Sequence, residues 1–135
     1  MDIKLTRCSL PVDDHDAAIA FYHDVLGFEV TADVKAEGAR FTTVRPPTQP
    51  GIDILLAPPA ANPDASPADR RALAELMAKG LLGWLVFTTD DCDATFAAVS
   101  ASGAEVVQEP IDQPYGVRDC AFRDPAGNLL RFNQA

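Results

Sequence analysis

The stretch VDDHDA at residues 12–17 recurs as TDDCDA at residues 89–94, 77 residues further along the chain. Each copy follows an extended apolar stretch and precedes a pattern typical of an amphipathic helix. We expect Asp14 and Asp91 to begin these two helices, because a carboxylate at the N-cap accepts hydrogen bonds from the free amides of the first turn. The sequence is therefore predicted to contain an internal repeat, and this repeat decides the fold.

The two copies also continue alike. LGFEV (26–30) and SGAEV (102–106) place a glycine where each helix must end, since glycine readily adopts the left-handed conformation. Extended segments follow both glycines, so each copy is predicted to form strand–helix–strand–strand–strand. The expected organisation is a single domain over residues 1–135. It divides into module one (1–57), a linker with an extra helix (58–80) and module two (81–135).

The extra helix has its own start and stop signals. Ser66 suits its N-cap, Pro67 its first position and Gly80 its end. This helix, expected over residues 67–79, either folds over one end of the sheet or contributes to a dimer. The sequence leaves both roles open.

Composition and charge narrow the class of protein. Hydrophobic residues make up 47% of the chain, enough for a real core. A net charge of −9 repels phosphate backbones, so no nucleic acid partner is expected. The longest apolar stretch, LLGWLVF (81–87), is too short to cross a membrane. The three cysteines form no CxxC and the first residues lack the apolar run of a signal peptide, so we expect a cytoplasmic protein.

Alternation along the strands predicts one apolar face and one mixed face in each module. Cys8 and Leu10 share the apolar face of the first strand, and Leu130 and Phe132 that of the last. The mixed face carries Arg7, Ser9, Asp53, Leu55, Trp84, Thr88, Arg131 and Asn133. Apolar walls with a few placed polar groups suit a small-molecule pocket. The alternative is an exposed antiparallel face with scattered apolar residues.

With the repeat, the segments LPVDDHDAAIAFYHDVLGF (10–28) and YGVRDCAFRDPAGNLLRF (115–132) resemble the vicinal oxygen chelate superfamily. Glyoxalase-type lyases, extradiol dioxygenases, fosfomycin-resistance transferases and bleomycin-binding proteins belong to it. The resemblance covers nearly the whole chain. It implies an α+β fold in which two tandem βαβββ modules form a curved mixed sheet around a cavity, with the helices on the outer face. It does not fix the function, because this fold hosts many chemistries.

The resemblance also implies where a metal would bind. In metal-using members, the first and last strands of each module supply the ligands, usually His and Glu. The matching positions here hold Arg7, Leu55, Trp84 and Arg131. None of these side chains is an ordinary ligand for a divalent metal, and Asp53 could not hold one alone. We therefore expect no metal, no cofactor and no chelation mechanism.

Four further residues stand out near the predicted helices and the final hairpin. His15 and His23 are interpreted as solvated surface histidines. Tyr115 and Arg118 belong to PYGVRD, which the resemblance assigns to the cavity wall. The proline and glycine of that stretch fit an ordinary turn equally well.

Two arginines on a partly apolar face need anionic partners, because an isolated buried charge is costly. Asp53 is the expected internal partner, and an arginine left over would hold an anionic ligand. Trp84 would supply a flat surface for stacking. No catalytic residue is assigned. The predicted ligand-binding residues are Arg7, Ser9, Asp53, Leu55, Trp84, Tyr115, Arg118 and Arg131.

These features favour a metal-independent small-molecule-binding protein of the glyoxalase/bleomycin-resistance type, with a polar or anionic ligand. We expect a homodimer, in which the modules pair within a chain or between chains. Two alternatives stay open. One is a metal-dependent lyase, isomerase or dioxygenase with a non-standard ligand set, such as His15 or Glu29. The other is a resistance protein that sequesters an antibiotic.

Overall fold

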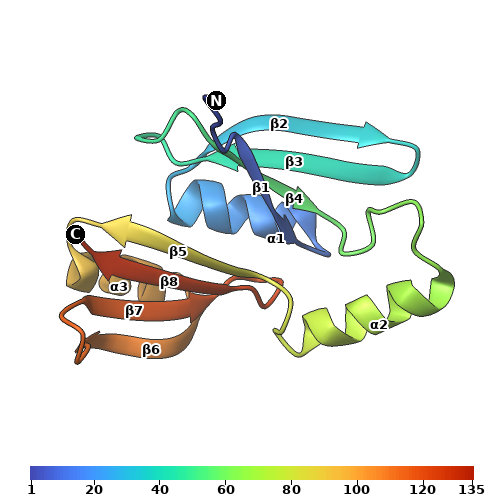
Figure 1. The fold of residues 1–135 in the computed structure, drawn as a ribbon. Helices are drawn as coiled ribbons and strands as arrows, with labels where there is room; N and C mark the ends of the chain where they lie inside the picture. Colours follow the sequence, from blue (N-terminus) through green and yellow to red (C-terminus); the bar gives the residue numbers. More distant parts are fainter.

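The computed structural model describes residues 1–135 and contains two sheets of four strands each (Figure 1). The first sheet has the strand order β1-β4-β3-β2 and the second has the order β5-β8-β7-β6. Each sheet contains one parallel pair, β1/β4 in the first and β5/β8 in the second, and its other neighbouring strands are antiparallel. The strands are β1 (Arg7–Pro11), β2 (Glu29–Ala36), β3 (Ala39–Arg45), β4 (Asp53–Ala57), β5 (Trp84–Thr89), β6 (Glu105–Asp112), β7 (Arg118–Arg123) and β8 (Leu129–Gln134). The duplicated α+β topology is confirmed. The sheets are curved, but they remain separate and do not close around a cavity within the chain.

One helix covers a face of each sheet (Figure 1). Module one has α1 (His15–Ile19), continued by η1 (Ala20–Val25), and module two has α3 (Cys92–Ala101). Asp14 and Asp91 cap these helices as predicted, each accepting a 3.0 Å hydrogen bond from a backbone amide three residues ahead. The predicted glycine stops are also confirmed, since Gly27 and Gly103 have positive φ angles.

The widening of the first helix into a π-helix at Ala20–Val25 was not predicted. Its signature is the long-step hydrogen bond from the amide of Leu26 to the carbonyl of Phe21, 3.1 Å long. Phe21 and Tyr22 are adjacent in sequence, and both are buried with their rings edge to face. The wider turn accommodates two neighbouring aromatic rings in the same core.

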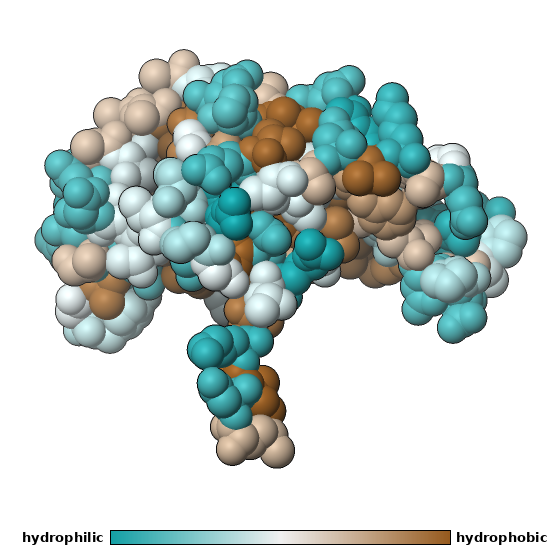
Figure 2. All heavy atoms as spheres, turned by 90° about the horizontal axis from the view of Figure 1, so that it is seen from above, coloured by the Kyte–Doolittle hydropathy of each residue, from teal (hydrophilic) through white to brown (hydrophobic).

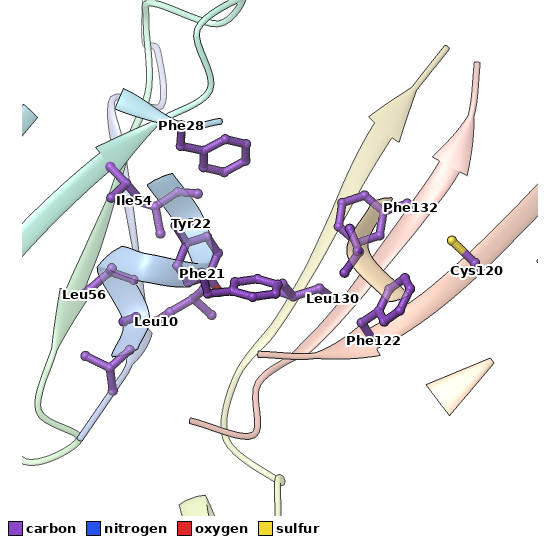
Figure 3. Packing of buried hydrophobic residues seen from close by; sticks show 14 of the residues in the cluster. Leu10, Phe21, Tyr22, Phe28, Ile54, Leu56, Cys120, Phe122, Leu130 and Phe132 are labelled. Atoms are coloured by element: carbon purple, nitrogen blue, oxygen red, sulfur yellow. The ribbon is translucent and has the colours of Figure 1, made fainter. Parts of the chain in front are cut away.

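The two modules share one hydrophobic core (Figure 3). The predicted apolar faces supply its centre, with Leu10 and Leu56 from module one and Leu130 and Phe132 from module two. Aromatic rings continue the core across the junction. The ring centroid of Phe28 lies 5.6 Å from that of Phe87, which stacks at 5.4 Å on Phe132. The chain therefore folds as two modules that bury their apolar faces against each other.

The DPAGN turn (124–128) ties the modules together. The Asp124 carboxylate accepts a 2.6 Å hydrogen bond from the Tyr22 hydroxyl and bonds of 2.8–2.9 Å from the side chain and the amide of Asn128. The Asn128 side chain also donates to the carbonyl of Pro11 in β1, at 2.8 Å. Tyr22, Asp124 and Asn128 are all buried. This motif therefore stabilises the junction between the two modules.

The extra helix, α2 (Pro67–Ala78), begins with the predicted Ser66 cap and ends before Gly80, whose φ is +73°. Figure 1 shows it extending away from both sheets, so it does not cover a sheet face. Met77 is its one buried residue. Its end is held where the Arg123 guanidinium donates to the carbonyls of Gly80 and Gly127, at 3.0 and 2.9 Å. No helix is long and apolar enough to span a membrane.

Candidate functional site

The outward faces of the two sheets carry the mixed set of residues that alternation predicts. In β5, Trp84 and Val86 are exposed, while Leu85 between them is half-buried towards the core. Trp84 leaves 67% of its surface open, which is unusual for the one tryptophan of the chain. In β1, Arg7 and Ser9 are likewise exposed. Both faces point away from the shared core and are open in the single chain.

A hydrogen-bonded cluster around Asp119 dominates the face of module two. Asp119 is 1% exposed, and its Oδ1 atom accepts hydrogen bonds of 2.7 Å from Gln108 and 3.0 Å from Gln113. Its Oδ2 atom lies 3.3 Å from Nη1 of Arg131 and 3.5 Å from the hydroxyl of Tyr115. The same Nη1 donates to the side-chain oxygen of Gln108 at 3.0 Å. The Arg131 side chain is thus fixed from one side by a buried carboxylate and an amide.

The cluster keeps Asp119 ionised. Burial alone would raise the pKa of its carboxyl group, but the hydrogen bonds from Gln113 and Gln108 and the charge of Arg131 outweigh it. The net result is a pKa lowered from the ordinary value. At neutral pH the face therefore carries a carboxylate and a guanidinium in contact, and their charges balance.

Beside this pair lies an unsatisfied polar atom. The side-chain oxygen of Asn133 is buried and has no hydrogen-bond partner. Asn133 pairs with Asp119 across β7 and β8 and lies two residues from Arg131 on the same strand face. Buried polar atoms almost always have a hydrogen-bond partner, and this chain supplies none for the Asn133 oxygen.

Module one has a looser counterpart around Asp53. Nη2 of Arg7 lies 3.7 Å from the Asp53 carboxylate, and the Arg7 side chain is more than half exposed. The hydroxyl of Thr31 donates to Asp53 at 3.2 Å and shares a 2.6 Å hydrogen bond with Thr43. Asp53, the expected internal partner for one of the two arginines, pairs with Arg7, and Leu55 follows on the same face of β4.

The structure brings the predicted residues together in two groups. The first group lies on the paired strands β1 and β4 of module one and contains Arg7, Ser9, Asp53 and Leu55. The second group lies in module two and contains Trp84, Tyr115 and Arg131. Arg118 lies apart. It donates to Asp93 at the start of α3 at 2.8 and 3.1 Å and to Asp112 at 3.3 Å.

Sequence reasoning missed the carboxylate that neutralises Arg131. Asp119 alternates with the core residues Cys120 and Phe122, so strand parity alone would have placed it on the mixed face. Gln108 lies between two register shifts of β6, and Gln113 lies at the start of the turn after this strand, so strand alternation does not predict their positions.

Two residues proposed as substitute metal ligands lie elsewhere. His15, expected in solvent, is 8% exposed, and its Nε2 atom has no partner. The reason is its place in the first turn of α1, whose inner side packs on the sheet of module one. Glu29 is exposed and 3.5 Å from Arg45. No three His, Cys, Asp or Glu side chains group as a metal site would require.

The donor chemistry at the four inferred ligand positions does not fit a divalent metal. Arg7 and Arg131 present cations that already contact carboxylates. Leu55 and Trp84 offer no lone pair. A metal needs imidazole, thiolate or oxygen donors at such positions.

A cavity of about 820 Å³ lies beside the junction between the modules, next to the end of α2. It is lined by Phe21, Val25, Met77, Arg123 and residues 124–127 of the DPAGN turn, among others. Two of its polar groups, the half-buried Arg123 and the buried Asp124, are already bonded to the chain itself. Its polar chemistry thus serves the junction between the modules.

Comparison with known proteins gives a consistent result. Residues 4–132 match the model of the Glyoxalase/Bleomycin resistance protein/Dioxygenase superfamily. Among solved structures, UcmS2 is 32% identical over the full length of both chains, with a TM-score of 0.88. TnmS3, an antibiotic binding protein from Streptomyces sp. CB03234, is 28% identical, with a TM-score of 0.75 and coverage of 99% of this chain and 98% of its own. A lactoylglutathione lyase from Agrobacterium tumefaciens is 25% identical, with a TM-score of 0.69, covering 100% and 96%.

Proposed function

Because the chain belongs to the Glyoxalase/Bleomycin resistance protein/Dioxygenase superfamily, we propose that it is a metal-independent protein that binds a polar small molecule between its outward sheet faces. One observation carries the proposal. The positions that the family resemblance assigns to metal ligands hold Arg7, Leu55, Trp84 and Arg131 in this chain. A fixed guanidinium, an aromatic ring and an aliphatic side chain suit the recognition of an organic molecule.

The site is completed by a second copy of the chain in this proposal. The chain exposes 7997 Å², whereas a folded monomer of 14.4 kDa exposes about 6,800 Å². The excess, about 1,200 Å², exceeds the roughly 800 Å² that each partner buries in a typical stable interface. The exposed apolar side chains on the open faces and on the projecting N-terminal segment (residues 1–5, Figure 2) supply suitable area. The face of module one then meets the face of module two from the partner.

The dimer has a direct test. Light scattering coupled to size exclusion is expected to give a mass of twice 14.4 kDa. Acrylamide should quench Trp84 fluorescence weakly, because the partner shields a ring that is 67% exposed in one chain. A mass of one chain together with full quenching would overturn the shared site.

Ligand binding is tested by a thermal-shift screen of metal-stripped protein against planar organic compounds, antibiotics included. A ligand that binds only the folded state at about 100 times its Kd adds about 2.7 kcal/mol. For a chain of this size, that raises Tm by roughly 9 °C. Compounds that raise the Tm of the wild-type protein should no longer raise the Tm of Arg131→Met. The control Arg71→Met removes the same charge on the exposed surface of α2, and the compounds should still raise its Tm.

One form of this function is the sequestration of an antibiotic. Likeness to TnmS3, named as an antibiotic binding protein, supports it. Arg7 and Arg131 each contact a carboxylate, so they do not exclude an uncharged drug. Expression in a sensitive host should raise tolerance to the compound found in the screen. Unchanged tolerance would exclude antibiotic sequestration as the function.

A lyase or isomerase is the second candidate, because a lactoylglutathione lyase shares the fold at 25% identity. The side chains at the four inferred ligand positions argue against it, because none of them is an ordinary ligand for a divalent metal. Addition of Ni²⁺, Zn²⁺, Mn²⁺ or Fe²⁺ to stripped protein should neither stabilise it nor produce glyoxalase activity. Activity that appears only with one of these metals would replace our proposal. The three free cysteines favour a cytoplasmic location for either function.

A further inference from the structure

The charges on the face of module two point to a more specific ligand. We infer that the site selects an uncharged molecule in which a carbonyl oxygen lies next to an N–H or O–H group, as in a primary amide or a hydroxyketone. Arg131 would donate to the oxygen and Asn133 would accept from the N–H or O–H. This inference rests on the proposed function and identifies the chemical class of its ligand.

The positive charge of Arg131 is balanced by a carboxylate of the chain itself. Its guanidinium lies 3.3 Å from the carboxylate of Asp119, which is 1% exposed. A buried carboxylate is not screened by solvent, so it cancels most of the attraction that Arg131 would exert on an anion. An anionic ligand would also lie close to the Asp119 charge. The site therefore favours a neutral hydrogen-bond acceptor over a carboxylate or phosphate.

The second step is the number of donors that Arg131 still offers. Both of its contacts, to Asp119 and to Gln108, use the Nη1 atom. A guanidinium has five N–H groups, and no contact occupies those on Nη2 and Nε. A quarter of the side chain is exposed on the open face. Arg131 is thus held in place by one edge and presents further donors to a ligand.

The third step is the orphaned oxygen of Asn133. It is buried without a partner, whereas Arg131 offers donors alone. Residues two apart on a strand lie about 7 Å apart on the same face, so one small planar group reaches between both side chains. Trp84 lies on the neighbouring strand β5, where Val86 pairs with Arg131. Its exposed ring can stack on the flat part of such a molecule.

Three planar probes of nearly equal size separate these features. Benzamide carries a carbonyl oxygen and an N–H donor, acetophenone the oxygen alone, and benzoate a negative charge without a donor. Dissociation constants are measured by ligand-observed NMR on the full-length protein. Because one neutral hydrogen bond changes affinity by about five- to tenfold, benzamide should bind about that much more tightly than either other probe.

Two variants assign the effect to residues. Asp119→Asn removes the balancing charge and should raise benzoate affinity about tenfold, so that benzoate overtakes benzamide. Asp112→Asn removes the same charge at an exposed site beside Arg118 and should leave the order unchanged. Asn133→Leu removes the acceptor, so the variant should bind benzamide and acetophenone with equal dissociation constants. Circular dichroism confirms that each variant is folded.

The outcomes distinguish this inference from the proposed function. Tighter binding of benzoate than benzamide to the wild-type protein would overturn the inference and leave the proposed function intact. Equal binding of benzamide and acetophenone to the wild-type protein would remove the role of Asn133 and overturn the inference. Failure of all three probes to bind, while a compound from the thermal-shift screen binds in an Arg131-dependent way, would overturn the inference and leave the proposed function intact.

Discussion

The hydroxyl of Tyr22, in η1 of module one, donates a 2.6 Å hydrogen bond to the carboxylate of Asp124, in the turn between β7 and β8 of module two. The residues lie 102 positions apart in sequence, and both are buried. The bond joins the two copies of the repeat at a point where Tyr22 is fully buried and Asp124 is only 5% exposed. The stability of the whole chain should therefore depend on it.

Tyr22→Phe should lower the free energy of unfolding by about 1–3 kcal/mol, because it leaves a buried carboxylate oxygen with one partner fewer. Urea denaturation measures this as a lower midpoint at an unchanged slope. The matched control is Tyr115→Phe, the same change at the other tyrosine, which is exposed and 3.5 Å from its acceptor. It should stay within about 0.5 kcal/mol of the wild type. Equal effects of the two substitutions would contradict this role for Tyr22.

The same tyrosine predicts a dependence on alkaline pH. Burial, and then the charge and hydrogen bond of Asp124, raise the pKa of Tyr22 well above its ordinary value of 10.0. The folded state therefore holds the proton more tightly than the unfolded state. Its contribution to stability is complete below pH 10 and is lost as pH rises above it. Urea midpoints measured from pH 8 to 11 should fall more steeply for the wild type than for Tyr22→Phe, and parallel curves would argue otherwise.

The Asp119–Arg131 pair predicts coupling between two substitutions. Asp119→Ala should cost about 2–4 kcal/mol, because it leaves Arg131 and two glutamine side chains without their acceptor. Combining it with Arg131→Met removes the uncompensated cation. The double variant should therefore be more stable than the sum of the single effects, by at least about 1 kcal/mol. Strict additivity in urea denaturation would show that the two side chains do not interact.

Gly83 predicts a steric effect at the start of module two. A Cβ atom there would overlap the side-chain amide of Asn128, which is itself held by Asp124 and Pro11. Gly83→Ala should lower Tm by several degrees, since each kcal/mol of lost stability is worth about 3–4 °C in a chain of this size. Gly51→Ala is the control, because nothing lies near its Cβ and its φ is not positive. A similar Tm for both variants would be inconsistent with the packing described.

Much of the fold was predictable because the repeat made each local signal appear twice. The caps at Asp14 and Asp91 and the glycine stops at Gly27 and Gly103 follow from backbone chemistry that neighbouring residues determine. The division of each strand into an apolar and a mixed face follows from simple alternation. The π-helical turn at Ala20–Val25 did not, because it depends on the core that receives two adjacent aromatic rings.

The site was less predictable, because its contacts join distant segments. Sequence placed Arg131 on the mixed face, but the partners that fix it come from β6, β7 and the turn between them. The pairing of Arg7 with Asp53 was foreseeable from the parity of two strands that proved to be neighbours. The buried position of His15 was not, because the sequence does not reveal which side of a first helical turn faces the sheet.

The central claim is that this chain binds small organic molecules without a metal. Trp84 is the only tryptophan and lies on the predicted binding face, so its fluorescence reports occupancy directly. The decisive measurement is a titration of chelator-dialysed protein with benzamide, acetophenone and benzoate, followed by Trp84 emission. We predict a saturable change with at least one probe, unaltered by added Zn²⁺, Ni²⁺, Mn²⁺ or Fe²⁺. A change that appears only after a metal is added would contradict the claim.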